Sequence, residues 1–360
     1  MITRDLRHAI ARAVAAAGFP PGDDPGLRPA GAPGQYAASV AFALDRKDPK
    51  RIAQTLAKLL SQEQWISAAD VTGVGYLTVT VTDESLRAVA DTVIAAGQAC
   101  VASDALRGKA APPALAGDPL AAATWEQARA ALAARLTARL AAAAGATVVD
   151  LPDKERSVVS LQVNSAAPSA ETTGRYADIT AAVGYAGRDA VTFTLARAIP
   201  GRLLWVAPKV IARHVLGNPA YAVRYAHARA ASGVRWAVAS ATADTIGVGE
   251  VPLLPGPDRR DIRGSGGSSP RVMTEGDRQL LNALSWLPER VATAARRGRP
   301  DEFARYLEDL ASVTIDVLSS PSHPGTGVAP GSGRLTLAKA AQTGLAAGLG
   351  LLDVTAPERL

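Results

Sequence analysis

Residues 218–229 read NPAYAVRYAHAR, a stretch that opens a long amphipathic helix. Asn218 is a favoured N-cap residue and the proline after it suits the first helical position, so the pair predicts a helix start. Apolar residues recur at helical spacing over most of the C-terminal half. The predicted helices span 176–198, 206–216, 218–244, 274–297, 300–319 and 333–352. Residues 176–360 are therefore predicted to form a mainly α-helical bundle.

Two long loops interrupt this predicted bundle, at 249–271 and 319–333, and both are rich in Gly, Pro and Ser. Thr274 and Asp277 follow the first loop and resemble a capping box, with Asp in place of the usual Glu or Gln. The next helix is therefore expected to begin at Thr274.

The N-terminal part of the chain has a mixed pattern. Residues 3–17 have apolar positions at helical spacing, with Thr3 as a candidate N-cap. The pattern predicts further helices at 35–46, after Pro49 and at 83–98, whereas β-branched alternation at 71–81 predicts a strand. Such a unit of about 100 residues is expected to be a compact α+β domain.

The middle of the chain is less regular. Residues 103–119 are rich in Ala, Pro and Gly and are predicted to be a linker, and 124–144 predicts a strong helix. TVVDL and SVVSLQV are strand-like, and a polar loop follows them. The chain is accordingly predicted to be multidomain, with an α+β domain at 1–98, a linker and small region at 99–175, and the helical bundle at 176–360.

Composition narrows the choice of partner. The net charge of +6 and the pI of about 9.6 favour polyanionic partners such as nucleic acid. Arginine strongly outnumbers lysine, and guanidinium groups bind phosphates and stack on bases. A mildly basic enzyme has the same charge, and high-GC coding gives the same arginine bias, so the choice depends on motifs.

Cysteine and histidine are scarce. Cys100 is the single cysteine, and the four histidines are His8, His214, His227 and His323. An internal disulfide is impossible, and no pattern of a zinc enzyme occurs, so no metal and no cofactor are expected. The sequence contains no uncharged apolar run of about 18 residues and no signal-peptide pattern, so a cytoplasmic location is expected.

Three stretches resemble arginyl-tRNA synthetase. NPAYAVRYAHAR looks like the segment that opens that family's helical anticodon-binding domain, and VGYAGRDAVTFTLAR at 183–197 looks like the motif behind the domain name DALR. WLPERVATAA, FARYLEDLAS and RLTLAKAAQTGLAAGLGLLDVTAPERL follow in the family's order. GQYAASVAFAL and VTGVGYLTVTV resemble the synthetase's additional N-terminal domain. The resemblance implies tRNA or a tRNA-like RNA as partner, and no DNA or membrane partner.

The signatures with which class I synthetases activate the amino acid are missing. No two histidines stand in a His-x-Gly-His turn, and neither Met1 nor Met273 adjoins a lysine. VNSAAPSAETTG stands where a Lys-Met-Ser-Lys-Ser loop would bring cations to the pyrophosphate, a task of electrostatic stabilisation. Residues 99–175 are also too few for a synthetase core, since one βαβ unit takes about 30 residues. We therefore expect a non-catalytic paralogue, with no catalytic residues.

Two stripes on the helix at 218–244 are candidates for RNA contact. At about 100° per residue, Arg224, His227 and Arg235 project within about 80° of one another. The neighbouring stripe contains Tyr221, Tyr225, Arg229 and Trp236. Cations beside aromatic rings suit an RNA loop, because they meet phosphates while unstacked bases lie on the rings. The candidate RNA-binding residues are Arg224, His227, Arg229, Arg235 and Tyr221, whereas Tyr225 and Trp236 are expected to pack in the bundle core.

A second candidate surface lies in the N-terminal domain. The resembled family recognises the D-loop of tRNA through a strand with an aromatic residue and an Asn two residues on, and the equivalent positions are Tyr76 and Thr78. Residues i and i+2 of a strand share a face, so the ring can stack on a base beside the hydroxyl. A hydroxyl reads a base edge less sharply than an amide does. The alternative is that Tyr76 only packs against the predicted helix at 35–46.

Three functions stay open from the sequence. The first is a non-catalytic paralogue of arginyl-tRNA synthetase that binds tRNA through both end domains. The second is a protein-interaction module that partners a complete synthetase or a tRNA-dependent biosynthetic enzyme. The third is an enzyme that uses charged tRNA in the middle region, although residues 99–175 contain no histidine. RNA binding with a steep salt dependence separates the first from the second.

Overall fold

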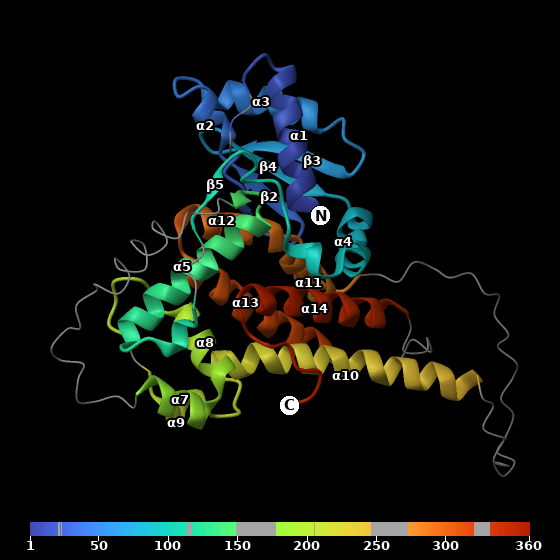
Figure 1. Ribbon diagram of the computed structural model, residues 1–360. Helices are drawn as coiled ribbons and strands as arrows, with labels where there is room; N and C mark the ends of the chain where they lie inside the picture. Colours follow the sequence, from blue (N-terminus) through green and yellow to red (C-terminus); the bar gives the residue numbers. More distant parts are fainter. Residues whose placement is uncertain are drawn as a thin grey trace, which may run out of the picture.

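The computed structural model describes residues 1–20, 22, 24–113, 117–148, 178–204, 206–245, 273–319 and 332–360. Its N-terminal domain is a four-stranded antiparallel sheet with helices around it (Figure 1). The strand order is β1 (Arg28–Pro29), β2 (Gln35–Ala38), β4 (Tyr76–Val81) and β3 (Ile66–Thr72). The helices are α1 (Ile2–Ala16), α2 (Val40–Leu44), α3 (Pro49–Leu60) and α4 (Asp83–Ala96). Strand β4 alternates between buried and half-buried positions, and α3 packs on β3 and β4.

Three predictions for this domain are wrong in detail. The segment 35–46 is not one helix, because residues 35–38 pair with β4 and only 40–44 are helical. The strand predicted at 71–81 is a hairpin of β3 and β4, which turns at Gly73 and Gly75, both with positive φ. Thr3 does not cap α1; its hydroxyl instead donates to the carbonyl oxygen of Ser285 at 2.8 Å.

The middle region packs onto the rest of the molecule where it is described. Its elements are η1 (Gly97–Val101), β5 (Ala110–Ala111), η2 (Pro119–Ala121), α5 (Trp125–Ala143) and β6 (Thr147–Val148), and β5 pairs with β6 in parallel. Leu106 and Ala111 are buried, so the segment predicted as a linker is anchored to the folded core at these two positions, while most of its other described residues are exposed or half-buried. SVVSLQV and the polar loop after it lie outside the described residues.

The C-terminal part is helical, as predicted. Its helices are α7 (Ile179–Ala186), α8 (Arg188–Arg197), α9 (Pro208–Ile211), α10 (Pro219–Thr245), α11 (Glu275–Ser285), α12 (Leu287–Arg297), α13 (Pro300–Ser319) and α14 (Ser332–Leu351). The long helix α10 lies along α13 and α14, as Figure 1 shows. The capping box of α11 is present in both directions, at 3.1 Å each. The loops predicted at 249–271 and 319–333 fall outside the described residues, apart from the ends that belong to α13 and α14.

The N-terminal domain sits directly on the bundle, above α11 and α12 (Figure 1). The fully buried Tyr36 of β2 stacks on Trp286 with ring centroids 5.3 Å apart, and its hydroxyl lies 2.7 Å from Ser285 Oγ. Glu289 of α12 is also buried, and it accepts from Arg7 of α1 at 2.5 Å and from Arg296 at 2.7 Å. The two parts are therefore joined by a packed polar and aromatic interface.

Candidate nucleic-acid interface

A ladder of aromatic rings lies at the start of α10. His214, in the segment before the helix, stacks on Tyr221 with centroids 5.2 Å apart and planes 12° from parallel. Tyr221 in turn stacks on Tyr225, at 5.7 Å and 22°. The imidazole is exposed and both phenol rings are half-buried, so the ladder has an open side. Helical phase could not predict the place of His214 in this ladder, because the residue lies before the start of α10.

The stripe of Tyr221 and Tyr225 continues along α10. Arg229 is exposed, and the side chain of Trp236 is 73% exposed. The expectation that Trp236 packs in the core is therefore wrong. The face of α10 that packs on α13 and α14 carries small and aliphatic residues, among them Val223 and Ala230, and Trp236 lies on a different face.

The side chains of the cationic stripe, Arg224, His227 and Arg235, all contact polar groups of other segments. Arg224 Nη2 lies 3.3 Å from Asp189 Oδ2 of α8. Arg235 donates to the carbonyl oxygen of Glu358 at 3.2 Å, and its other terminal nitrogen lies 3.7 Å from the Glu358 carboxylate. His227 is buried, with Nδ1 2.8 Å from the carbonyl oxygen of Pro357. The last residues of the chain thus lie against α10 over this stripe.

The environment of His227 favours the neutral ring. Burial lowers the pKa of His227, and it outweighs the opposing effects of the Pro357 carbonyl and the Glu358 carboxylate. Because a carbonyl oxygen can only accept, Nδ1 carries the proton of the neutral ring. The ring is thereby fixed as a link between α10 and residues 357–358.

In the N-terminal domain, Tyr76 and Thr78 share the sheet face opposite the buried residues of β4, as predicted. The guanidinium carbon of Arg28 lies 4.7 Å from the centre of the Tyr76 ring, and the Phe42 ring of α2 lies 4.9 Å from it at a tilt of 54°. Thr78 Oγ1 is 3.1 Å from Thr72 Oγ1. Arg28 is exposed, so this guanidinium presents a further planar surface above the ring.

Cations gather beside this face. Arg46 and Lys47 are exposed between α2 and α3, and Lys50 is exposed in the first turn of α3. The hairpin turn approaches this segment so closely that a Cβ built on Gly75 would meet Pro49 at 2.9 Å. These cations therefore lie close to the hairpin turn that precedes Tyr76.

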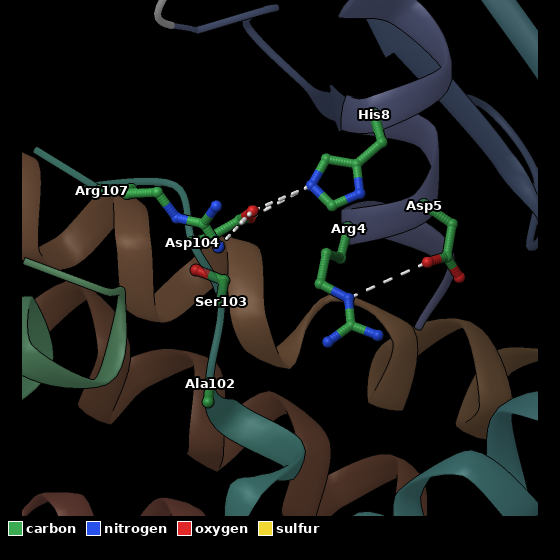
Figure 2. Close-up of a pocket in the computed structure, with 7 residues that line it drawn as sticks. All are labelled: Arg4, Asp5, His8, Ala102, Ser103, Asp104 and Arg107. Atoms are coloured by element: carbon green, nitrogen blue, oxygen red, sulfur yellow. Dashed lines mark hydrogen bonds and ion pairs between the residues drawn. The ribbon is translucent and has the colours of Figure 1, made fainter.

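A polar cavity of about 400 Å³ lies between α1 and the segment after η1 (Figure 2). Figure 2 shows Asp104 between His8 and Arg107, with the carboxylate 3.1 Å from His8 Nε2 and 3.4 Å from Arg107. Burial raises the pKa of Asp104, but the hydrogen bond from His8 and the nearby cations lower it further, so the net pKa is below its ordinary value. Ser103 Oγ accepts from the amide of Ala105 at 3.4 Å. These groups connect α1 to the middle region.

Two further kinds of site are absent from the described ranges. No group of three or more His, Cys, Asp or Glu side chains there is placed to hold a metal ion. No described helix is both long enough and apolar enough to cross a membrane. Burial raises the pKa of the Cys100 thiol to about 12, so that thiol stays protonated at neutral pH.

Comparison with known proteins gives the class of the two ends. Residues 4–81 match the family described as the arginyl tRNA synthetase N terminal domain, and residues 223–360 match the DALR anticodon binding domain. The chain is thus built from a synthetase N-terminal domain and an anticodon-binding domain, with residues 82–222 between the two matches. Both ends of the chain are therefore similar to domains of arginyl-tRNA synthetases.

Individual proteins that are similar to this chain have the same family name as the two matched domains. The arginine–tRNA ligase of Bifidobacterium longum subsp. infantis is 31% identical over 201 residues, which cover 49% of this chain and 29% of the ligase. That of Frankia alni is 33% identical over 183 residues, 48% of this chain and 29% of the ligase. The match thus spans less than a third of these curated relatives. The Thermus thermophilus arginyl-tRNA synthetase has a similar fold, with a TM-score of 0.59 at 16% identity over 100% of both chains.

Proposed function

We propose that this protein binds tRNA, or an RNA of similar shape, through both end domains and does not charge it. The observation that carries the proposal is the half-open ladder of His214, Tyr221 and Tyr225 at the start of α10. Stacked rings beside an exposed cation such as Arg229 suit unpaired bases and their phosphates. The ladder adjoins and enters the anticodon-binding domain match, which supports tRNA rather than another polyanion.

The sheet face of the N-terminal domain supports RNA binding at two separate points. The face with Tyr76 and Arg28 lies in the matched N-terminal domain, with three exposed cations beside it. The packed interface with α11 and α12 holds this domain on the bundle. Two weak contacts on one body gain affinity through effective concentration. An L-shaped RNA offers two separate unpaired regions for such a body.

The sequence supports the absence of charging activity. Neither ATP-activating signature of class I synthetases occurs anywhere in the chain. Without cations at the phosphates, the transition state of adenylate formation lacks its main electrostatic stabilisation. The described elements between the matched ends are short, apart from the helices, and β5 and β6 have two residues each. A synthetase active site needs a larger parallel sheet.

A second candidate function rests on a different surface. Leu203, Val210 and Leu216 are exposed by 77%, 52% and 55%, and all lie within α9 or a few residues of it in the sequence. Exposed aliphatic groups close together are typical of protein–protein contacts. This surface favours a module that docks on a protein, for example a complete synthetase or a tRNA-dependent biosynthetic enzyme.

Binding measurements over a range of salt test the proposal. We expect the full chain to bind tRNA more tightly than an RNA duplex of equal length, with an affinity that falls steeply as salt rises. Tyr225→Ala should weaken this binding, because base–aromatic stacking contributes about 1–3 kcal/mol per base. Equal affinity for tRNA and duplex, or no binding at low salt, would show that the ladder does not serve RNA.

The proposed lack of charging activity is tested by a separate experiment. We expect no arginine-dependent exchange between ATP and pyrophosphate above background, with tRNA present. Measurable exchange that depends on the protein would contradict the proposal, whatever the result for RNA binding.

A further inference from the structure

We propose that Trp236 is a second base-stacking site, which extends the RNA-binding surface along α10 beyond the aromatic ladder. The inference rests on the proposed RNA binding and adds a longer unpaired strand as its ligand. Trp236 is 73% exposed, whereas Trp125 and Trp286 are buried at 7% and 3%. An exposed indole on a packed helix needs a reason outside the fold itself.

The helix places Trp236 in line with the ladder. At about 100° per residue, Tyr221, Tyr225, Arg229 and Trp236 lie within about 80° of one another. Eleven residues separate Tyr225 from Trp236, which is about 16 Å along the axis at about 1.5 Å per residue. A stacked strand advances about 3.4 Å per nucleotide, so this interval corresponds to about five nucleotides.

The surface between the rings suits a strand of nucleotides. Arg229 is exposed about midway, and its planar guanidinium can pair with a phosphate or lie on a base. Ser232 and Gly233 follow it, so no bulky side chain stands between Arg229 and Trp236 on this face. The four stripe positions and Ser232 carry no carboxylate, which leaves the stripe positive.

RNA fits this surface better than a protein partner does. Leu203 and Leu216 are exposed near α9, at the other end of α10 from Trp236. Val238 is exposed too, but two residues of helix place it about 160° away from Trp236, so it does not form an apolar patch with the indole. A protein-binding hot spot normally lies within a well-packed patch that excludes water. Isolated rings spaced along a cationic face are typical of single-strand binding.

Two single-stranded RNA oligonucleotides, of three and eight nucleotides, test the proposal on the full chain. The shorter one reaches the ladder alone, whereas the longer one spans the interval to Trp236. We expect Trp236→Ala to weaken the longer oligonucleotide about tenfold or more and to leave the shorter one unchanged. Trp236→Phe should restore much of the loss because it keeps a ring, and Trp236→Leu should not.

Fluorescence reports the contact directly. The longer oligonucleotide should quench indole emission in the parent protein, and this change should disappear in Trp236→Phe. Melting of Trp236→Ala should match the parent within about 0.5 kcal/mol, because the side chain is exposed.

The outcomes separate this inference from the proposed function. If the parent and Trp236→Ala bind both oligonucleotides and tRNA equally, the inference is wrong and RNA binding stands. If Trp236→Ala instead abolishes self-association in sedimentation without changing RNA affinity, Trp236 serves a protein contact and the inference is also wrong. If the parent binds no RNA, the proposed function itself fails.

Discussion

At the scale of single residues, partners decide which cations of α10 are available to RNA. Arg224 and Arg229 are five residues apart, yet Arg224 pairs with Asp189 and Arg229 is exposed. Asp189 also accepts from the backbone N–H of Thr355 at 3.2 Å and from its hydroxyl. The Asp189 carboxylate therefore joins α8, α10 and the end of the chain.

This contrast gives a paired prediction. Arg229→Ala should leave melting within about 0.5 kcal/mol of the parent, weaken RNA binding and make the log–log salt slope shallower by about one. Arg224→Ala should instead lower the free energy of unfolding by about 1–2 kcal/mol, because the Asp189 carboxylate loses a partner inside the fold. Chemical denaturation and salt-dependent RNA binding measure both effects. Unchanged stability in Arg224→Ala would show that its ion pair contributes little.

The buried His227 predicts a pH dependence of stability. Its pKa is lowered in the folded state by burial, so between the folded value and the ordinary value of about 6.5 the unfolded chain binds more protons. The contribution of the neutral ring is complete above about 6.5 and is lost as the pH falls toward the folded pKa. His227→Gln keeps a donor for the Pro357 carbonyl and does not titrate in this range.

We therefore expect the parent to lose more stability than His227→Gln between pH 8 and pH 5, as measured by urea denaturation. The carboxylates titrate alike in both proteins and cancel in the comparison. Parallel pH profiles would show that the folded state binds the His227 proton as readily as the unfolded chain does.

At the scale of helices and strands, signals within one turn of the chain predict an element correctly, whereas pairing between distant segments cannot be predicted from the sequence. The start of α11 follows from Thr274 and Asp277, which bond to each other's backbone within one turn. The segment 35–46 has helical spacing too, but residues 35–38 pair with β4, more than 35 residues away in the chain. The exposure of Trp236 could not be predicted for the same reason, because only the position of α13 and α14 determines which face of α10 is covered.

For the candidate site the sequence identified the stripes but not their roles. Helical phase correctly grouped Arg224, His227 and Arg235. The carboxylates and carbonyl groups that pair with them come from α8 and residues 357–358, which no spacing rule connects to α10. The stacking of Arg28 on Tyr76 likewise depends on the sheet, because β2 lies between β1 and β4.

The sheet face gives a prediction at this scale. Arg28→Ala should weaken tRNA binding and leave melting nearly unchanged, since the guanidinium is exposed and lies over the outer side of Tyr76. Tyr76→Ala should lower both affinity and stability, because its ring also packs against Phe42 of α2. Arg4→Ala is a suitable control for charge, because Arg4 lies on α1, outside this face. If Arg28→Ala and Arg4→Ala reduce affinity equally, the effect is general charge and not a site.

At the scale of the whole molecule, the interface beneath the N-terminal domain makes the two ends one body. The Glu289 carboxylate is 5% exposed and stands between the guanidinium groups of Arg7 and Arg296, and Asp24 pairs with both arginines. Burial, with Arg7 and Arg297 nearby, lowers the pKa of Arg296 to about 10, so this guanidinium remains charged at neutral pH. Isolated end fragments would expose this cluster, so point variants of the full chain are the better test of a two-point grip.

We expect the buried cluster around Glu289 to make the two ends of the molecule unfold together. Glu289→Ala leaves two neighbouring guanidinium groups with one fewer carboxylate in a buried site, and removing one partner of a buried pair costs about 3–5 kcal/mol. Glu302→Ala removes the partner of Arg297 in an exposed pair at 3.1 Å, which is worth about 0–1 kcal/mol, and serves as the control. Because the cluster joins α1 to α12, the parent should unfold in a single calorimetric transition, and Glu289→Ala should either lower its midpoint or split it in two. A parent that already melts in two separate transitions, or a Glu289→Ala variant that melts like Glu302→Ala, would show that the N-terminal domain and the bundle are not coupled through this interface.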